Sequence, residues 1–292
     1  MKAYNGLVLA AVLSATLLWG SSFIALKTVL QTCDADFVIF GRLFLAALCA
    51  LPLYKHFKNI PYEKGDWRLL FLLGLCEPCL YFIFESKALM LTTSGQAGMI
   101  TALMPAMVAM GAWLLFRENM NVRIASGFFM ALAGVFILTW AGEATATAPD
   151  PIRGNFYEFL AMVTATGYVL VLKKLSSRYS PLFLTTVQSV TGALFFGVRV
   201  LISPVPLPVD LPALSWWIIA YLGMGVSFGA YFSYNFAVSR MPASQAAAFI
   251  NLIPVISLGL GRIFLGETLT LIQFGAAALI LFGVYLSQER PA

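Results

Sequence analysis

The sequence predicts an all-α integral membrane protein of ten transmembrane helices, arranged as two inverted five-helix repeats with both termini in the cytoplasm. Three observations support this. Of the 292 residues, 60% are hydrophobic and 11% charged, and the mean hydropathy is +0.87, whereas charged residues make up about a quarter of an ordinary soluble domain. The apolar residues form long runs, and part of the first half of the chain recurs in the second.

Ten apolar runs are separated by short polar loops. Because a helix needs about 20 apolar residues to cross a bilayer, each run is expected to be one span. The first, Tyr4 to Leu26, is longer than the roughly 7 to 15 residues of a signal-peptide h-region. The others are Asp36 to Tyr54, Trp67 to Met90, Gly95 to Phe116, Val122 to Trp140, Gly154 to Lys173, Pro181 to Ile202, Leu214 to Val238, Ala243 to Phe264 and Leu269 to Leu286. They leave almost no room for a soluble domain.

The distribution of basic residues predicts the orientation. With the N-terminus inside, twelve Lys or Arg residues near span ends are cytoplasmic and four are external, as the positive-inside rule requires. The polar loop from Gly142 to Arg153 is interpreted as an external linker, so the expected units are residues 1–141, 142–153 and 154–292. Since each repeat has an odd number of spans, the second enters from the opposite face. Inverted repeats commonly hold a substrate site between them near the midplane.

The repeat is clearest between residues 96–135 and 245–284, which align at a shift of 149 with eight identities in 40 positions. Pro105 and Pro254 form one identical pair. Because proline removes a backbone donor and kinks a helix, these two residues are candidate gates. The alternative is that prolines are simply frequent in spans. Pro78 predicts a further kink in the third span.

Other matched residues suggest structural roles. Glu118 and Glu267 each stand in a loop between two spans and are interpreted as caps on the fifth and tenth helices. Lys27 and Lys174 align at a shift of 147. Each is expected to end the first span of its repeat and to extend toward the interface.

The third span carries a polar face. Glu77, Tyr81 and Glu85 are spaced four residues apart and therefore share one side of a helix. At a shift of 150, Tyr81 aligns with Tyr231 and Glu85 with Asn235. A carboxylate at the bilayer centre costs about 2.5 to 3.5 kcal/mol on insertion scales. Glu85 or Glu77 is therefore either a site for protons or for a substrate ammonium, or one member of a structural pair with Lys27, Arg42 or Lys87.

The substrate-binding candidates are polar or aromatic residues at membrane depth. The full set is Trp19, Ser22, Tyr81, Glu85, Gln96, Tyr168, Tyr231, Asn235, Gln245 and Asn251. Capping is the alternative for the two glutamines, and ordinary packing for the aromatic residues. Asn251 lies about 120° around the helix from Gln245, so at most one of them points into a common cavity.

Several motifs resemble a known family. The phrase GETLTLIQFGAAALILFGV, residues 266–284, is similar to the end of a domain of the drug/metabolite transporter (DMT) superfamily, in its EamA branch of ten-helix carriers. Trp19-Gly20, Lys27 and Arg42 also match that family. The first repeat departs from its pattern, with FREN at 116–119 where the second has LGET at 265–268. Within the family, the chain most resembles bacterial amino-acid exporters of the YddG type. That resemblance implies a cell inner (plasma) membrane location and a broad or aromatic-leaning amino-acid substrate.

An intramembrane enzyme is the competing class. It would need a nucleophile, a base or metal ligands at depth, but the single histidine, His56, lies in a loop, and neither H-E-x-x-H nor G-x-S-x-G occurs. Cys76 and Cys79 form a C-x-x-C inside an apolar span, where a thiol is inert. We therefore expect no catalytic residue, metal or cofactor.

The remaining partners follow from charge. The net charge of +5 comes from Lys and Arg in short loops, so we expect a monomer in the lipid bilayer with a small-molecule substrate and no nucleic acid. The sequence has no nucleotide-binding motif that would indicate transport driven by ATP, and this favours a secondary carrier. Only flux kinetics would distinguish a carrier from a channel. Amino acids suit a site with Ser, Tyr, Asn, Gln and a carboxylate. Phosphorylated sugars would need more cations, and a cationic drug would rely on Glu85, because the first span has no acidic residue.

Overall fold

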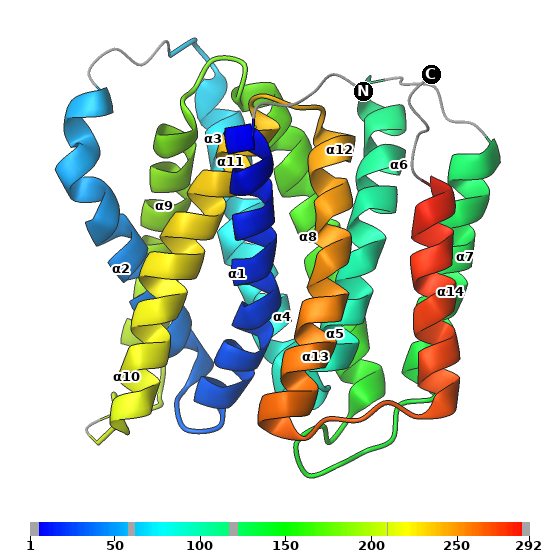
Figure 1. The fold of residues 1–292 in the computed structure, drawn as a ribbon. Coiled ribbons are helices and arrows are strands. Elements are labelled where there is room, and N and C mark those ends of the chain that lie inside the picture. The colour runs from blue at the N-terminus through cyan, green and yellow to red at the C-terminus, as the bar shows by residue number, and fades with distance from the viewer. Residues whose placement is uncertain (1–5, 58–61, 117–121, 209, 288–292) are drawn as a thin grey trace.

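The computed structural model describes residues 6–57, 62–116, 122–208 and 210–287, and these residues are nearly all helical (Figure 1). The first five spans are formed by α1 (Gly6–Leu30), α2 (Ala35–Ala50) with η1 (Leu51–Phe57), α3 (Asp66–Gly74) with η2 (Leu75–Leu80) and α4 (Tyr81–Leu91), α5 (Ser94–Ile100) with η3 (Thr101–Leu103) and α6 (Met104–Phe116), and α7 (Val122–Trp140). The last five are α8 (Pro151–Leu175), α9 (Pro181–Ile202), α10 (Ala213–Ala220) with η4 (Tyr221–Ala230) and α11 (Tyr231–Val238), α12 (Ala243–Ala248) with η5 (Phe249–Leu252) and α13 (Ile253–Leu265), and α14 (Leu271–Ser287).

The ten-span prediction is confirmed. Nine helical segments in the described residues are long and apolar enough to cross a membrane, and α14 is a shorter apolar helix of 17 residues. Within the same residues, extended pairing is limited to one isolated bridge between Thr145 and Ala148 in the linker. The fold is therefore the all-α membrane bundle expected from the hydropathy.

Irregular segments occur at matched places in the two halves. The third and eighth spans each contain a π-helical segment, η2 and η4, and the fourth and ninth each contain a 3₁₀ segment, η3 and η5. In η2 the backbone leaves helical geometry at Glu77, beside Pro78, so the kink predicted there is confirmed. Pro105 and Pro254 are each the second residue of the helix that follows a 3₁₀ segment.

The two halves pack against each other throughout the bundle. Helix α2 packs on α9, α4 on α8, α1 on α11 and α13, α5 on α13, and α7 on α14. In Figure 1, α7 and α14 form one edge of the bundle, and α2, α9 and α10 lie toward the other. We call the end where α1 begins and α14 ends the terminal end. The opposite end, where residues 142–150 join α7 to α8, is the linker end.

Glycines allow α7 and α14 to approach closely. A Cβ atom added to Gly283 would lie 2.5 Å from the backbone nitrogen of Ala131, and one added to Gly127 would lie 2.4 Å from the carbonyl oxygen of Gly283. Small residues allow such contacts between spans, where packing rather than water exclusion drives helix association. These positions therefore need glycine for steric reasons.

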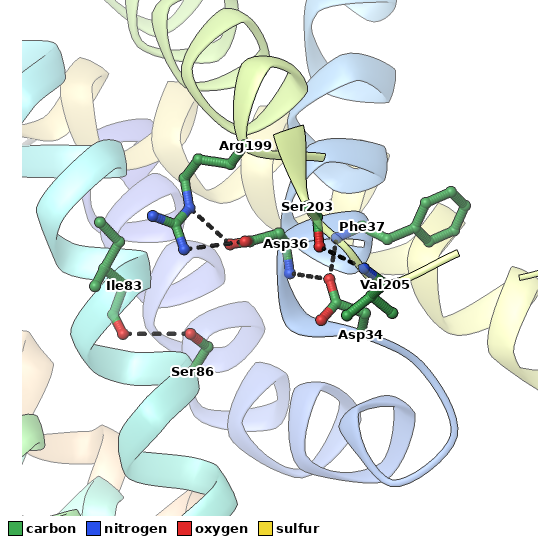
Figure 2. A network of polar contacts seen from close by, with 8 residues as sticks. All are labelled: Asp34, Asp36, Phe37, Ile83, Ser86, Arg199, Ser203 and Val205. Carbon is green, nitrogen blue, oxygen red and sulfur yellow. Dashed lines mark hydrogen bonds and ion pairs between the residues drawn. The ribbon is translucent and has the colours of Figure 1, made fainter. Parts of the chain in front are cut away.

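Polar ties join the halves at both ends. At the linker end, Figure 2 shows the Arg199 guanidinium facing Asp36, with two hydrogen bonds of 2.9 Å. At the terminal end, Asp66 accepts hydrogen bonds of 2.8 Å from Arg178 and 2.7 Å from the Tyr179 hydroxyl. Burial and the hydrogen bond to Asp66 raise the pKa of Tyr179 to about 12. Tyr179 consequently remains a neutral donor at physiological pH.

Lys27 is buried rather than extended toward the interface. Its side chain is 3% exposed, and its ammonium group donates to the carbonyl oxygens of Leu89 and Thr92 at the end of α4 and of Thr147 in the linker. The predicted snorkelling is wrong, because three free carbonyls within the protein offer the ammonium group the solvation that it would otherwise seek in water.

The second repeat has a similar contact, made by a different lysine. Lys173 donates to the carbonyl oxygens of Val238 at 2.9 Å and Met241 at 2.8 Å, just after α11. Lys174, which the sequence alignment paired with Lys27, is exposed. In each half, therefore, a lysine near the end of the first span holds the chain at the end of the third.

Glu267 links the two repeats. Its carboxylate accepts hydrogen bonds from the backbone nitrogen of Ser94 at 2.8 Å, from the Ser94 hydroxyl at 2.7 Å and from the backbone nitrogen of Gly95 at 2.9 Å. The prediction that Glu267 caps the tenth helix is wrong, because it caps α5 at the start of the fourth. The corresponding prediction for Glu118 lies outside the described residues.

Candidate functional site

A narrow cavity lies in the middle of the bundle, with about 40 Å³ of space for the centres of water-sized molecules. Spans from both repeats contribute to its wall. The lining residues are Trp19, Ser22, Phe23, Arg42, Glu77, Tyr81, Phe82, Glu85, Thr101, Met104, Met162, Ala165, Tyr168, Tyr231, Ile250 and Ile253.

The wall of the cavity follows the sequence repeat. Thr101 and Met104 line it from the fourth span, and Ile250 and Ile253, at a shift of 149, line it from the ninth. The 3₁₀ segments of both spans therefore reach the cavity. Pro105 and Pro254 directly follow Met104 and Ile253, so each candidate gate sits next to the cavity wall.

Six of the predicted binding residues line this cavity. They are Trp19, Ser22, Tyr81, Glu85, Tyr168 and Tyr231. Sequence spacing placed Glu85 and Tyr81 together correctly, because helix α4 presents positions four residues apart on one face. No ligand contact tests these residues, so their role in binding remains a prediction.

Aromatic rings form one side of the cavity. Trp19 packs edge-on to Tyr231, with ring centroids 5.6 Å apart, and lies 4.8 Å from Tyr234. Tyr168 lies 6.2 Å from Tyr231 in another edge-on contact. Edge-to-face packing adds about 0.5 to 1.5 kcal/mol per pair to the area buried. This side is therefore a rigid surface that is apolar apart from its hydroxyl groups.

Carboxyl groups also line the cavity. Glu85, 3% exposed, accepts a hydrogen bond of 2.7 Å from the Tyr81 hydroxyl, and Glu77, 5% exposed, accepts one from the Tyr231 hydroxyl. In each residue the second carboxyl oxygen has no hydrogen-bond partner among the described residues. None of the ion pairs found in that part of the chain includes either residue. Each carboxyl group therefore has one oxygen available to a ligand.

Arg42 supplies the positive charge of the cavity. Its Nε donates a hydrogen bond of 2.8 Å to the Ser227 hydroxyl, and its guanidinium lies 4.4 Å from the centre of the Phe82 ring. The side chain is 1% exposed, and Nη1 has no partner within the described residues. Glu85 lines the same cavity. The cavity thus has one unpaired guanidinium donor in the field of a carboxyl group.

Asn235 lies behind the cavity wall. Its side-chain oxygen accepts a hydrogen bond of 2.8 Å from the Tyr168 hydroxyl, and its nitrogen donates to Thr185 at 2.9 Å and Gln188 at 3.1 Å. Gln188 in turn donates to the backbone carbonyl of Glu77 at 3.3 Å. Asn235 consequently fixes Tyr168 in place, but it does not reach the cavity.

The other three predicted binding residues lie away from the cavity. Gln96 is buried at the linker end, where its side-chain oxygen accepts from Asn155 at 2.9 Å. Gln245 is exposed at the start of α12. Asn251 is half-buried in η5, and its side-chain oxygen has no partner among the described residues. For Gln96, the interpretation as a structural residue fits this geometry better than a cavity role.

Glu158 is a buried carboxyl group that the sequence analysis did not single out. It lies on α8, is 0% exposed, and neither carboxyl oxygen has a hydrogen-bond partner in the described part of the chain. Helix α8 packs along α4, the helix that carries Glu85. A lone acidic residue in an otherwise apolar span is itself a signal of function, so the sequence did contain the information needed to find it.

Metal chemistry has no candidate within the described residues. They contain no group of three or more His, Cys, Asp or Glu side chains that could hold a metal ion. The four cysteines are free thiols, with Cys79 buried and Cys76 half-buried.

Comparison with known proteins identifies the fold as that of a transporter family. The model of the EamA-like transporter family matches residues 6–140 and 152–288. An uncharacterised transporter of Archaeoglobus fulgidus is 27% identical over 274 residues, which cover 92% of this chain and 94% of that protein. The uncharacterised inner membrane transporter YhbE of Escherichia coli is 25% identical over 269 residues, covering 88% and 81%. Neither name states a substrate, so the narrower resemblance to amino-acid exporters stays a prediction.

Structural similarity agrees with this assignment. A solved crystal structure superposes with a TM-score of 0.67 at 20% sequence identity, covering 97% of this chain and 96% of the other. At that identity the match shows the fold alone. The two matched segments together span nearly the whole sequence, and the relatives are named as transporters rather than enzymes. The chain belongs to the EamA-like transporter family.

Proposed function

We propose that this transporter is a secondary-active exporter of amino acids, with broad or aromatic-leaning selectivity, which binds its substrate in the central cavity. The observation that carries the proposal is the pair of unpaired polar atoms on one cavity, Nη1 of Arg42 and Oε2 of Glu85. A zwitterion needs one partner of each sign, since a buried charge is tolerated only when it is paired. Arg42 suits the substrate carboxylate and Glu85 its ammonium group.

The rest of the cavity suits a side chain. Trp19, Tyr168 and Tyr231 offer ring faces and edges to the cavity. Such rings pack against both aromatic and aliphatic groups, which supports broad selectivity. The space open to water-sized molecules is about 40 Å³ in this structure, so the side chains around the cavity must move apart to admit an amino acid.

Alternating access is supported by the difference between two equivalent glutamines. Gln96, near the start of the fourth span, is 3% exposed, while Gln245, its partner at a shift of 149, is exposed near the start of the ninth. Inverted repeats that exchange their conformations open one end while closing the other. We infer a state closed at the linker end, where Glu267 binds α5, and more open at the terminal end. In the predicted orientation in the cell inner membrane, the terminal end faces the cytoplasm.

A cationic substrate is the second candidate. Glu77, Glu85 and Glu158 together outnumber the single guanidinium of Arg42 at this depth. This excess of acid would also suit a lipophilic cation.

Counterflow separates these possibilities. Labelled phenylalanine, threonine or methionine is offered to proteoliposomes loaded with each unlabelled amino acid, with a nucleotide sugar and a quaternary ammonium compound as comparison loads. Saturable uptake that depends on an amino-acid load is expected, because only a carrier exchanges one substrate molecule for another. A response to a comparison load alone would refute the substrate class, and uptake that does not saturate would indicate a channel.

Arg42 provides a sharper test of the zwitterion. Arg42→Gln is expected to raise the KM for phenylalanine about tenfold or more, because hydrogen bonds to charged groups contribute about 1.5 to 3 kcal/mol. The KM for phenethylamine, which lacks the carboxylate, is expected to change little. Arg262→Gln, at an exposed position of α13, is the control. Equal losses for both compounds would contradict a carboxylate contact.

A further inference from the structure

The Glu158 carboxyl group has no assigned role and an unusual environment. It is completely buried, and neither oxygen has a hydrogen-bond donor among the described residues. An ionised carboxylate without a donor or counter-ion is very costly in an apolar medium. Glu158 must therefore either hold a proton or face a cation that comes and goes.

Its position connects it to the cavity. Helix α8 packs along α4. A Cβ atom added to Gly154 would lie 2.8 Å from the backbone nitrogen of Thr92, and one added to Gly167 would lie 3.0 Å from Sγ of Cys76, so Glu158 lies at about the level of Glu85. Glu158 precedes Met162 by four residues and Ala165 by seven, and both of these line the cavity. Residues at these spacings share a helix face. Glu158 thus lies about one turn beyond the cavity wall, on the side of the linker end.

Among the described residues, the elements packed on α8 bring few ionisable groups to the level of Glu158. The elements α5, η3, α6 and α12 also pack on α8 and contain no ionisable side chain. Those of α3 and α7 lie at the terminal end. The ionisable groups on the packed elements are Tyr81, Glu85 and the exposed Lys87 of α4, Cys76, Glu77 and Cys79 of η2, Tyr231 and Tyr234 of α11, Asp66 and Arg68 of α3, and Arg123 of α7.

The charges of the cavity do not balance without an added cation. Glu77, Glu85 and Glu158 are three carboxyl groups, and Arg42 is the one guanidinium of the cavity wall. Two neighbouring carboxylates in an apolar site cannot both be ionised, so one retains a proton. An ammonium group that entered beside Glu85 would supply the same positive charge and make that proton unnecessary.

We propose that Glu85 and Glu158 form one proton-exchange site, in which a proton and the ammonium group of the substrate replace each other. The proposal rests on the proposed function. In the empty cavity the pair shares a proton on a carboxyl oxygen. When the substrate binds, its ammonium group forms hydrogen bonds with Glu85, the carboxyl O–H bond breaks, and the proton passes to water. When the substrate leaves, the pair takes a proton from water again. Export is thereby coupled to proton entry.

Infrared spectroscopy tests the proton site without any substrate. The acid-minus-alkaline difference spectrum of the wild type is expected to contain the C=O stretch of a protonated carboxyl group at an apolar site, and Glu158→Gln is expected to lose or shift it. Glu143→Gln, an exposed carboxyl group in the linker, is the matched control and should leave the band unchanged. An identical band in Glu158→Gln would overturn the proposal.

Transport gives the second readout. Protons should compete with the substrate in wild-type counterflow, so the KM rises as pH falls. In Glu158→Gln, which lacks the neighbouring carboxyl group, the pH of half-maximal inhibition should be lower than in the wild type by about one unit or more. In Glu158→Asp, which keeps a carboxyl group, this pH should stay close to that of the wild type. The same pH profile in Glu158→Gln and wild type would contradict a shared proton.

Two further outcomes, a variant that does not fold and a substrate class that is wrong, can be distinguished from failure of the proposal. If Glu158→Gln does not fold, the wild-type protein provides the test. Adding an amino acid that gives counterflow should weaken the band of the protonated carboxyl group. An unchanged band overturns the proposal. If no amino acid gives counterflow, the proposed substrate fails, while the acid-minus-alkaline spectra still test the carboxyl pair.

Discussion

Replacing Glu267 by Gln should weaken the closure of the linker end. The Glu267 carboxylate accepts three hydrogen bonds from Ser94 and Gly95 across the interface between the repeats. Glutamine keeps one acceptor but presents an amide nitrogen, itself a donor, in place of the second. Hydrogen bonds to a charged group contribute about 1.5 to 3 kcal/mol each. Because Glu267 is half-buried, we take the lower value, and two lost bonds amount to about 3 kcal/mol. That corresponds to about a hundredfold in the ratio of the two access states.

A pair of equivalent alanines reports this shift. Ala97 and Ala246 align at a shift of 149, and both are 0% exposed. In a cysteine-free background, Ala97→Cys should react faster with a membrane-impermeant thiol reagent when Glu267→Gln is present, whereas Ala246→Cys should not gain reactivity. Glu143→Gln serves as the control for loss of a carboxylate. Unchanged labelling at both positions would refute the view that Glu267 stabilises a closed end.

Four other substitutions test the fold and the gates. Pro105→Ala or Pro254→Ala should lower kcat for counterflow more than it weakens binding, because the proline lies beside the cavity at a helix break, and a pure loss of affinity would exclude gating. Lys27→Met should lower stability by about 3 kcal/mol in thermal unfolding, since it leaves buried carbonyls unpaired, whereas the exposed Lys174→Met should have little effect. Gly283→Ala should cost about 2 kcal/mol or more through overlap with α7, whereas Gly275→Ala on the same helix, with open space at its Cβ, should not. Equal melting temperatures within either pair would contradict these contacts.

Sequence patterns were sufficient for the spans and for much of the cavity wall. Apolar run length predicted ten helices because the bilayer fixes the length of a span. Spacing by four residues placed Tyr81 and Glu85 on one face, and the repeat matched Tyr231 to Tyr81. These predictions depend only on helix geometry and on the inverted arrangement, which a single sequence reveals directly.

Contacts between distant segments were not predictable in the same way. Lys27 was expected at the interface and Glu267 beside its own next helix, yet each binds backbone groups of the third-to-fourth span region. Free backbone groups at span ends seek any partner within reach, and reach is set by tertiary packing. Gln96 was a binding candidate for its polarity alone, although the nearest acceptors and donors belong to Thr92 and Asn155.

The contrast between symmetric and asymmetric positions explains what the repeat can and cannot reveal. The 3₁₀ segments, the prolines and the tyrosines that face the cavity occur in both halves, as expected if the halves exchange conformations during transport. The charges do not. Glu85 aligns with Asn235, and at a shift of 147 Arg42 aligns with Ser189 and Glu158 with Ala11. A substrate molecule has no two-fold symmetry, so a site at the interface needs each charge only once. The alignment of the halves therefore points to the candidate gates, whereas the chemistry of the proposed site must be sought where the halves differ.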